Sequence, residues 1–194
     1  MAKKESTFTS MLLTLFIVTL ASSAALGFVY ELTKEPVSVA KSAKKTMAIK
    51  RVMPPFDNNP GLDKYSVPTD NDSVYFYVAK EGEDTVGLAA ETYSNKAFGG
   101  TLKLLVGFLP DGTIKDIAVL ENKETPGLGD KMLKSKTNWS TQFEGKNPAS
   151  FKLKVKKDGG DVDAITASTI TSRAYCDAVQ RAYNALETEK GDKK

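Results

Sequence analysis

The sequence contains no histidine and only one cysteine, Cys176, among its 194 residues. Without histidine, the chain lacks the side chain that most often acts as a general base or a metal ligand near neutral pH. A single cysteine excludes an intramolecular disulfide and any zinc or iron–sulfur site built from several thiolates. A hydrolase triad and a metal centre are therefore poorly supported, and redox chemistry would need an external cofactor.

Neither sign of charge dominates, because 27 basic and 24 acidic residues leave a formal net charge of +3. A nucleic-acid-binding surface usually needs a marked basic excess, so this balance gives no support for a nucleic-acid partner. The sequence also lacks internal repeats and low-complexity tracts. Its length allows one domain and an anchor.

The N-terminal segment, residues 1–30, is predicted to be a single transmembrane anchor. No charged residue occurs from Ser6 to Tyr30, and a helix of that length, at about 1.5 Å per residue, exceeds a hydrocarbon core of about 30 Å. A cleaved signal peptide is the alternative, since Lys3 and Lys4 form a basic start and Ser22–Ala25 are small. Either reading brings the chain to a membrane.

After the anchor, residues 31–72 are expected to form a membrane-proximal helix and a linker, broken by Pro54, Pro55 and Pro60. Residues 73–187 are expected to form the folded domain, and the charged segment 188–194 is expected to fray. The domain should be α+β, an antiparallel sheet with packed helices.

The strands of this sheet are predicted from residue type and turn chemistry. Pro110-Asp111-Gly112 is typical of a turn between two of them. A short helix is expected at Lys131–Lys136, with Trp139 and Phe143 as core anchors. Apolar residues from Tyr175 to Leu186 recur at helical spacing and predict a final helix. The predicted strands are Ser73–Lys80, Thr85–Thr92, Thr101–Leu109, Ile114–Leu120 and, later, Phe151–Val155.

Five hydroxyl side chains gather just before the final helix, in the stretch Asp163–Arg173. Small hydroxyl residues suit a helix N-terminus, where the first amide protons lack an intrahelical partner. The same amides and the positive end of the helix dipole form an anion site. The stretch therefore predicts either a capped helix or a capped helix that holds a phosphate.

A second candidate stretch, Glu124-Thr125-Pro126-Gly127-Leu128-Gly129, follows a predicted strand. Proline makes it rigid, and glycine lets the backbone approach a flat ligand without an intervening Cβ. Leu128 could then lie against a ring face. Read alone, the stretch is also consistent with a simple turn in which Asp130 caps the next helix.

The order Asp163, two residues, Thr166, Ala167, Ser168, Thr169 resembles the D-x-x-(S/T)-G-A-T signature of proteins that carry covalent FMN. Ala167 replaces the usual glycine and Ser168 the usual alanine, so a second hydroxyl stands beside the acceptor. Together with the Glu124–Gly129 loop, the motif resembles the RnfG family of membrane-bound Rnf complexes, which are ion-pumping ferredoxin:NAD oxidoreductases. The resemblance covers most of the chain.

The resemblance implies an FMN-binding domain with one FMN per chain, esterified through its phosphate to Thr169. Thr166 would cap the helix or bind phosphate oxygens, and Thr171 and Ser172 would cap helix amides. Gly127 and Leu128 would contact the isoalloxazine ring. The remaining residues expected to bind the cofactor are Ala167, Ser168, Ile170, Glu124, Thr125 and Gly129.

The same resemblance implies a role as an electron-carrier subunit in the cytoplasmic (inner) membrane, rather than as a stand-alone enzyme. Expected partners are other membrane and iron–sulfur or flavin subunits, membrane lipid and a flavin transferase that uses FAD. Lysines after the span would by themselves favour a cytoplasmic domain, whereas the resemblance implies one that faces the periplasm or cell exterior.

Three other functions remain open at this point. The first is the equivalent FMN subunit of a sodium-translocating NADH:quinone oxidoreductase, which shares the motif. The second is a membrane-anchored flavin-binding sensor without turnover. The third is an exported binding module whose hydroxyl-rich stretch only caps a helix.

Overall fold

The computed structural model describes residues 7–69 and 72–192. These residues form two units, one up to Lys44 and one from Lys45 onward, each described here by itself. The elements are α1 (Phe8–Val52), β1 (Lys64–Thr69), β2 (Asp72–Glu81), β3 (Asp84–Ala97), β4 (Gly100–Phe108), β5 (Ile114–Glu121), three short 3-10 helices, η1 (Gly129–Met132), η2 (Trp139–Phe143) and η3 (Lys156–Asp158), and α2 (Thr169–Asp192).

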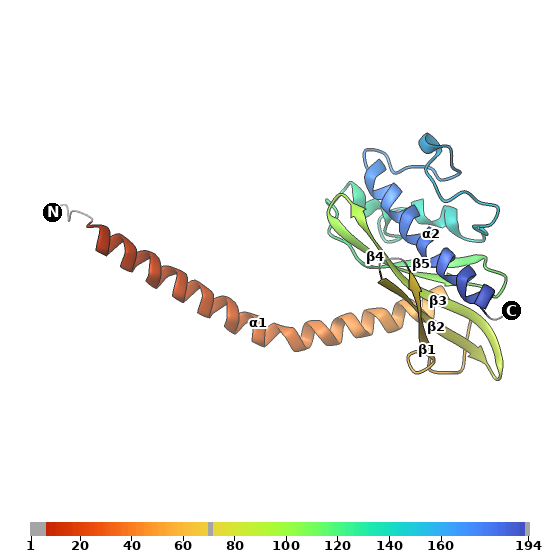
Figure 1. Ribbon diagram of the computed structural model, residues 1–194, viewed down its shortest axis with the longest axis horizontal. Helices are drawn as coiled ribbons and strands as arrows, with labels where there is room; N and C mark the ends of the chain where they lie inside the picture. The colour runs from red at the N-terminus through yellow and green to blue at the C-terminus, as the bar shows by residue number, and fades with distance from the viewer. Residues whose placement is uncertain (1–6, 70–71, 193–194) are drawn as a thin grey trace. The chain divides into compact units, whose positions relative to one another are not determined.

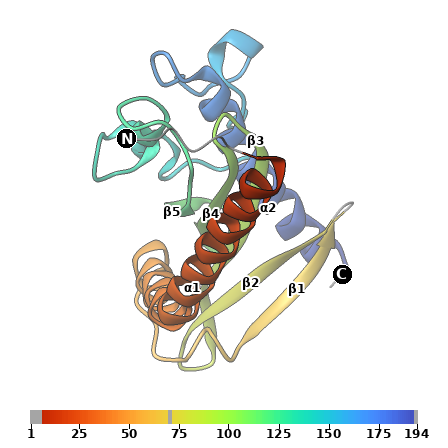
Figure 2. The same ribbon diagram turned by 90° about the vertical axis from the view of Figure 1, so that its left-hand side faces the viewer.

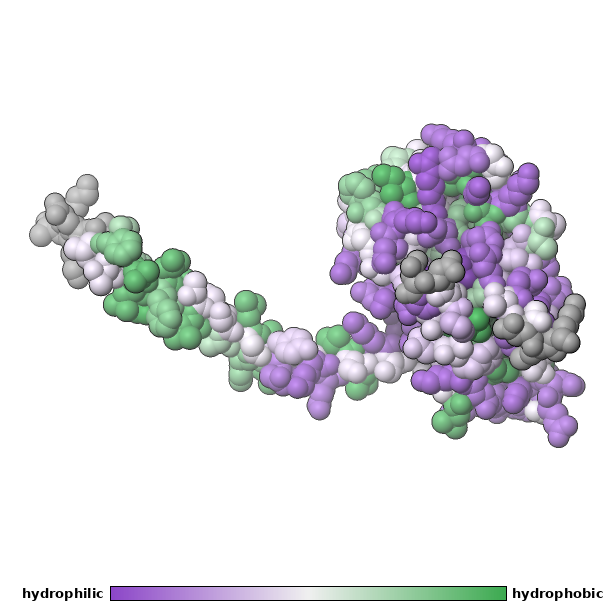
Figure 3. Space-filling view, in the orientation of Figure 1, coloured by the Kyte–Doolittle hydropathy of each residue, from purple (hydrophilic) through white to green (hydrophobic). Residues whose placement is uncertain are grey.

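The N-terminal part of α1 exposes apolar side chains along its length, as the hydrophobic colouring in Figure 3 shows. Two of its threonine side chains form hydrogen bonds within the helix. The hydroxyls of Thr14 and Thr19 donate to carbonyls one turn earlier, at 2.8 and 2.9 Å. Among the described residues, α1 is the one helix long and apolar enough to cross a membrane. This confirms the expectation of a single N-terminal helix before the domain.

The domain is built on a five-stranded antiparallel sheet in the order β1-β2-β3-β4-β5, so each strand pairs with its neighbours in sequence (Figures 1 and 2). The four strands predicted between residues 73 and 120 are present, and β3 continues to Ala97. Strand β1 was missed, because it lies in the predicted linker. Only Val67 of its six residues is buried, so its apolar signal is weak.

The two faces of the sheet bury different partners. Alternate residues of β4, such as Leu104 and Phe108, pack with Tyr175 and the other buried residues of α2. Leu105, which points the other way, packs with Val52 at the end of α1. The sheet therefore packs against α2 on one face (Figure 1) and against Ala48, Ile49 and Val52 of α1 on the other.

Two elements predicted after the sheet were wrong. The segment Phe151–Val155 is irregular, with a single parallel bridge between Val155 and Val162. Leu153 and Val155 are buried as expected, but the backbone of this segment forms local hydrogen bonds, mainly to residues 160–162, rather than to the sheet. The predicted helix Lys131–Lys136 is instead the 3-10 helix η1 followed by turns.

The final helix α2 is present and continues to Asp192, within the segment expected to fray; residues 193–194 lie outside the described residues.

A cluster of charged side chains fixes the segment after β5 to the rest of the domain. Asp116 of β5 accepts hydrogen bonds from Lys134 Nζ at 2.6 Å and from Arg51 Nε at 3.1 Å. Lys134 also pairs with Glu144. Burial lowers the pKa of Lys134, but the hydrogen bonds to the two carboxylates outweigh it and raise the pKa above its ordinary value. The lysine is therefore charged and holds the chain between η1 and η2.

Candidate functional site

The hydroxyl-rich motif lies at the start of α2. Thr169 is the first residue of the helix, and the first helical hydrogen bond runs from the Ser172 amide to the Ser168 carbonyl at 3.0 Å. Within the described chain, no acceptor pairs with the backbone amides of residues 169–171. These three donors, together with the positive end of the helix dipole, give the motif the capacity to hold an anion.

A tight turn presents this helix start, and Ala167 is the residue that makes it. Its φ is +62°, and among the described residues it is the one non-glycine with a positive φ. A Cβ is unfavourable in the left-handed region, by roughly 1–2 kcal/mol. The resembled signature has glycine at this position, and glycine adopts a positive φ without this penalty. Ala167, which replaces it, is strained.

Ser172 has a different role from the cap expected for it. Its fully buried hydroxyl accepts a hydrogen bond from the Ile165 amide at 2.9 Å and donates to the Ser168 carbonyl at 3.0 Å. The side chain therefore ties the first turn of α2 to the segment that enters it. Thr171 also lies in the first turn and is buried. Because α2 begins at Thr169, the cap position is that of Ser168.

The other end of the motif is held by η2. The Trp139 indole N–H donates to the Asp163 carbonyl at 2.6 Å, and the Asp163 amide donates to Gln142 Oε1 at 2.8 Å. The Asp163 carboxylate pairs with Lys156 at 2.8 Å. Trp139 packs edge-on against Tyr175 of α2. Trp139 is therefore a partly buried side chain that packs against the core, and it also anchors the motif.

Exposure distinguishes the hydroxyls of the motif. Thr166 is exposed and Thr169 is half-buried, whereas Ser168 is buried, with only 8% of its surface exposed to solvent. Ile170, beside the acceptor position, is 49% exposed although it is apolar. A group that approaches from solvent thus meets Thr169 more readily than Ser168.

The Glu124–Gly129 loop begins with a hydrogen-bonded turn. The Leu128 amide donates to the Thr125 carbonyl at 3.1 Å, Pro126 occupies the second position, and Gly127 has a φ of +78°. This is the pattern of a type II turn, which needs glycine at its third position. Asp130 Oδ1 accepts from the Gly127 amide at 2.7 Å. Asp130 therefore stabilises the preceding turn. The simple-turn interpretation instead required Asp130 to cap the following helix.

Glu124 lies under this loop and connects it to the β3–β4 hairpin. The residue is 8% exposed, and its Oε1 accepts a hydrogen bond from the Gly99 amide at 3.3 Å. Gly129 packs so closely on it that an added Cβ would overlap the Glu124 carboxylate. Two apolar side chains flank this contact in sequence, Leu128 at 41% and Phe98 at 72% exposure. Their exposure leaves an apolar surface available to a flat ring.

Phe98 was missed from the sequence, because it stands in the polar stretch Tyr93–Gly100. The signal that would have found it is a large aromatic residue directly before two glycines. At 72% exposure in the hairpin turn, Phe98 adds to the apolar surface beside the Glu124–Gly129 loop.

The structure brings the two candidate stretches to the same side of the core without joining them directly. The loop leads into η1, which packs beside α2, and Met132 of η1 shares a hydrophobic cluster with Tyr175. Within the described part of the chain, no hydrogen bond or ion pair links residues 124–129 to residues 166–171.

A salt bridge fixes the helix start to the irregular segment before it. Arg173 donates two hydrogen bonds to the Asp158 carboxylate, both at 2.7 Å. These bonds are the main cause that lowers the pKa of Asp158 below its ordinary value. The positive side chains of Arg173 and Lys156 are thus each paired with a carboxylate of the chain itself.

Comparison with known proteins gives a consistent result. The family described as FMN-binding domain matches residues 97–184. A protein of Shewanella amazonensis, named as the G component of an ion-translocating oxidoreductase complex, is 33% identical over 172 residues, which cover 84% of this chain and 80% of that protein. Proteins of the same name from Erwinia tasmaniensis (32% over 188 residues, 90% of each chain) and Haemophilus influenzae (33% over 174 residues, 86% and 84%) are similar.

Proposed function

Since the chain belongs to the RnfG family of ion-translocating oxidoreductase complexes, we propose that it carries FMN covalently on Thr169 and passes electrons to other subunits. Membership makes the chain an FMN-carrying subunit of an Rnf-type complex, anchored to a membrane by α1. The names of the relatives favour this reading over the subunit of a sodium-translocating NADH:quinone oxidoreductase. The covalent bond, the acceptor residue and the orientation are our proposals.

The residues at the start of α2 fit FMN. The phosphate would meet the free amides of residues 169–171, and the half-buried Thr169 hydroxyl is the first side chain of the helix. This hydroxyl beside three unpaired amides is the observation that carries the proposal. The exposed apolar side chains of Leu128, Phe98 and Ile170 would contact the ring.

A covalent bond suits this open site. Amides and dipole at an exposed helix start stabilise an anion by only about 0.3–1 kcal/mol, which is too little to retain a soluble cofactor. Bound FMN supplies the redox chemistry, while the protein attaches and orients it. A ring at the surface would let neighbouring carriers approach closely enough for electron exchange.

The chain has no histidine to activate the Thr169 hydroxyl, and an unassisted hydroxyl is a poor nucleophile. We therefore propose that a separate flavin transferase performs the attachment with FAD as donor. The Thr169 oxygen forms the new bond to phosphorus, and the pyrophosphate bond of FAD breaks. AMP leaves, and the hydroxyl proton passes to a base of the transferase.

Denaturing mass spectrometry tests the attachment. Co-expression with the transferase should add the mass of one esterified FMN to the wild-type chain and to Ser168→Ala. Thr169→Ala should lose the adduct, and its circular dichroism should match that of the wild type. A full adduct on Thr169→Ala, or a peptide map that assigns the flavin to Ser168, would refute the assignment.

We also propose that the domain faces the periplasm or cell exterior. Lys64 is exposed at the start of β1, so Lys64→Cys offers a thiol to a membrane-impermeant reagent. The native Cys176 is buried, and burial raises its pKa to about 12. We therefore expect Cys176 not to react with the reagent. Labelling of intact cells freed of any outer-membrane barrier supports the proposal. Labelling that requires lysis contradicts it.

A further inference from the structure

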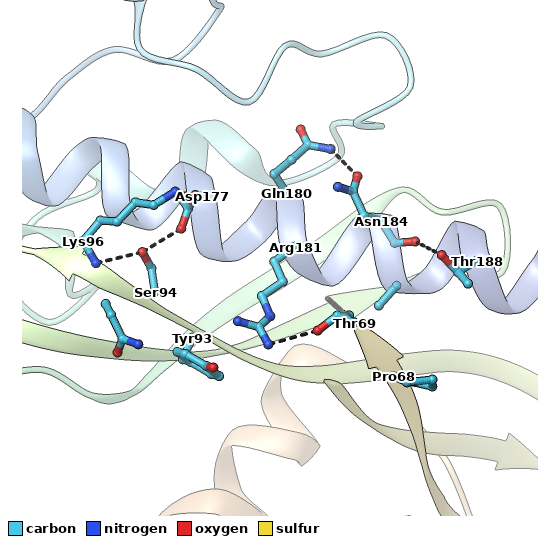
Figure 4. Close-up of a pocket in the computed structure, with 12 residues that line it drawn as sticks. Pro68, Thr69, Tyr93, Ser94, Lys96, Asp177, Gln180, Arg181, Asn184 and Thr188 are labelled. Carbon is cyan, nitrogen blue, oxygen red and sulfur yellow. Dashed lines mark hydrogen bonds and ion pairs between the residues drawn. The ribbon is translucent and has the colours of Figure 1, made fainter. Parts of the chain in front are cut away.

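The domain has a polar groove between α2 and the ends of β1 and β3, and it contains none of the residues of the FMN motif (Figure 4). Its volume is about 880 Å³, and its walls are the α2 face from Asp177 to Thr188, the end of β3 from Tyr93 to Lys96, and Pro68–Thr69 of β1. The nearest wall residue on α2 is eight positions from Thr169, about 12 Å along the helix. The proposed FMN site leaves this groove unexplained.

One positive side chain in the groove is held in place without an ion pair. The Arg181 guanidinium lies over the Tyr93 ring, 4.2 Å from its centroid, and Nη2 donates to Thr69 Oγ1 at 3.1 Å. Among the described residues it forms no salt bridge, and its buried Nε has no hydrogen-bond partner. The pKa of the nearby Asp72 is lowered mainly by the Ser73 amide, with smaller contributions from Tyr93 and from the charge of Arg181.

The other charges of the groove are already satisfied. Lys96 pairs with Asp177 at 2.5 Å, and Asp177 also accepts the Ser94 hydroxyl at 2.8 Å. The groove therefore presents one guanidinium that forms no salt bridge among the described residues. A guanidinium fixed by stacking keeps a planar set of donors suited to a carboxylate. Charge complementarity thus selects an acidic occupant.

The shape of the groove favours a polypeptide over a small molecule. The wall residues Asp177, Gln180, Arg181, Asn184, Ala185 and Thr188 follow one helix face for about 16 Å, the length of about five extended residues. Small-molecule pockets are mostly apolar, whereas here the amides of Gln180 and Asn184, bonded to each other at 2.8 Å, offer partners for a peptide backbone.

We propose that this groove binds an extended acidic segment of another subunit of the complex, with a carboxylate on Arg181. The inference rests on the proposed function, because it requires that the chain work within a complex. It adds a docking surface on the side of α2 away from the Thr169 end.

Zero-length cross-linking of the purified complex tests the proposal. Carbodiimide joins an amine to a carboxylate in contact with it and does not act on arginine. Arg181→Lys should therefore yield a peptide in which the introduced lysine is bonded to an aspartate or glutamate of another subunit. Arg173→Lys is the matched control on the same helix, and it should cross-link within the chain, to Asp158.

A second variant tests the same surface independently of the introduced amine. Asn184 is exposed, so Asn184→Asp should fold normally, while its added charge should weaken retention of the chain in the complex about tenfold in a salt-wash titration. Asn184→Gln should behave as the wild type. The FMN adduct on Thr169 should be unchanged in both variants.

The outcomes separate this proposal from the one on which it rests. If the wild-type chain does not co-purify with other subunits, the proposed function fails. If the wild-type complex forms but the lysine introduced at position 181 cross-links only to its own chain, or Asn184→Asp is retained normally, the groove is not the docking site.

Discussion

The indole N–H of Trp139 donates a 2.6 Å hydrogen bond to the carbonyl oxygen of Asp163, across 24 positions of sequence. Through this bond a core aromatic residue sets the position of the first residue of the FMN motif. The packing of η2 against α2 and the geometry of the motif are thus linked.

Trp139→Phe should break this link while retaining most of the ring packing. Loss of one hydrogen bond typically costs about 1 kcal/mol, measurable by denaturant unfolding. Because the motif would be held less firmly, we also expect a several-fold slower gain of the FMN adduct on co-expression with the transferase. Thr141→Ala, an exposed change in η2, is the control. Adduct formation at the wild-type rate in the folded Trp139→Phe variant would contradict an anchoring role.

Ala167→Gly should stabilise the domain by about 1 kcal/mol, because glycine adopts a φ of +62° without a Cβ penalty. The usual effect of alanine-to-glycine changes is the opposite, since glycine gains more entropy in the unfolded chain. Ala149→Gly, at an exposed position whose φ is not positive, should therefore destabilise. Equal losses at both positions would show that the turn at Ala167 is not strained.

Alanine should affect the two glycines of the loop differently. At Gly127 an added Cβ meets open space, so only the positive φ is penalised, by about 1 kcal/mol. At Gly129 the Cβ would overlap Glu124, and overpacking of this kind costs about 1–3 kcal/mol. Gly129→Ala should also disturb the contact between Glu124 and Gly99 and change the flavin absorption spectrum. An unchanged spectrum in a folded Gly129→Ala variant would count against the loop as a ring contact.

Asp158 should contribute stability that depends on pH. Because Arg173 lowers the pKa of this carboxyl below 3.8 in the folded state, its contribution is fully present above the unfolded value and is lost as the pH falls through the folded one. The difference in unfolding free energy between the wild type and Asp158→Asn should be constant above about pH 5 and shrink below about pH 4. A difference independent of pH would mean that the salt bridge is not what the substitution removes.

Local sequence signals were sufficient where they were strong. The turn at Pro110–Gly112, the β-rich stretches of β2 and β4 and the helical spacing of α2 each predicted the correct element. The segment Phe151–Val155 shows the limit of such signals. Its alternation correctly predicted burial, but burial also occurs in an irregular chain whose hydrogen bonds are local.

The sequence motif predicted which residues form the candidate site, but it did not predict the geometry of those residues. The motif predicted a site at positions 166–171. The positive φ of Ala167 and the hydrogen bonds of the Ser172 hydroxyl depend instead on how the chain enters α2. The contacts of Trp139 and Glu124 with distant backbone depend on tertiary packing. No spacing within the sequence encodes those contacts, because their partners lie 24 and 25 positions away.

The strand order has a consequence for biosynthesis. Each strand pairs with its predecessor, so the whole sheet can assemble while translation proceeds, at about 5–20 residues per second. The face that α2 covers, with Phe76, Leu104 and Phe108, is nevertheless complete about fifty residues before α2 begins. The nascent chain must therefore carry an uncovered apolar sheet for several seconds, which makes the interval between β5 and α2 the stage at which it most needs a chaperone.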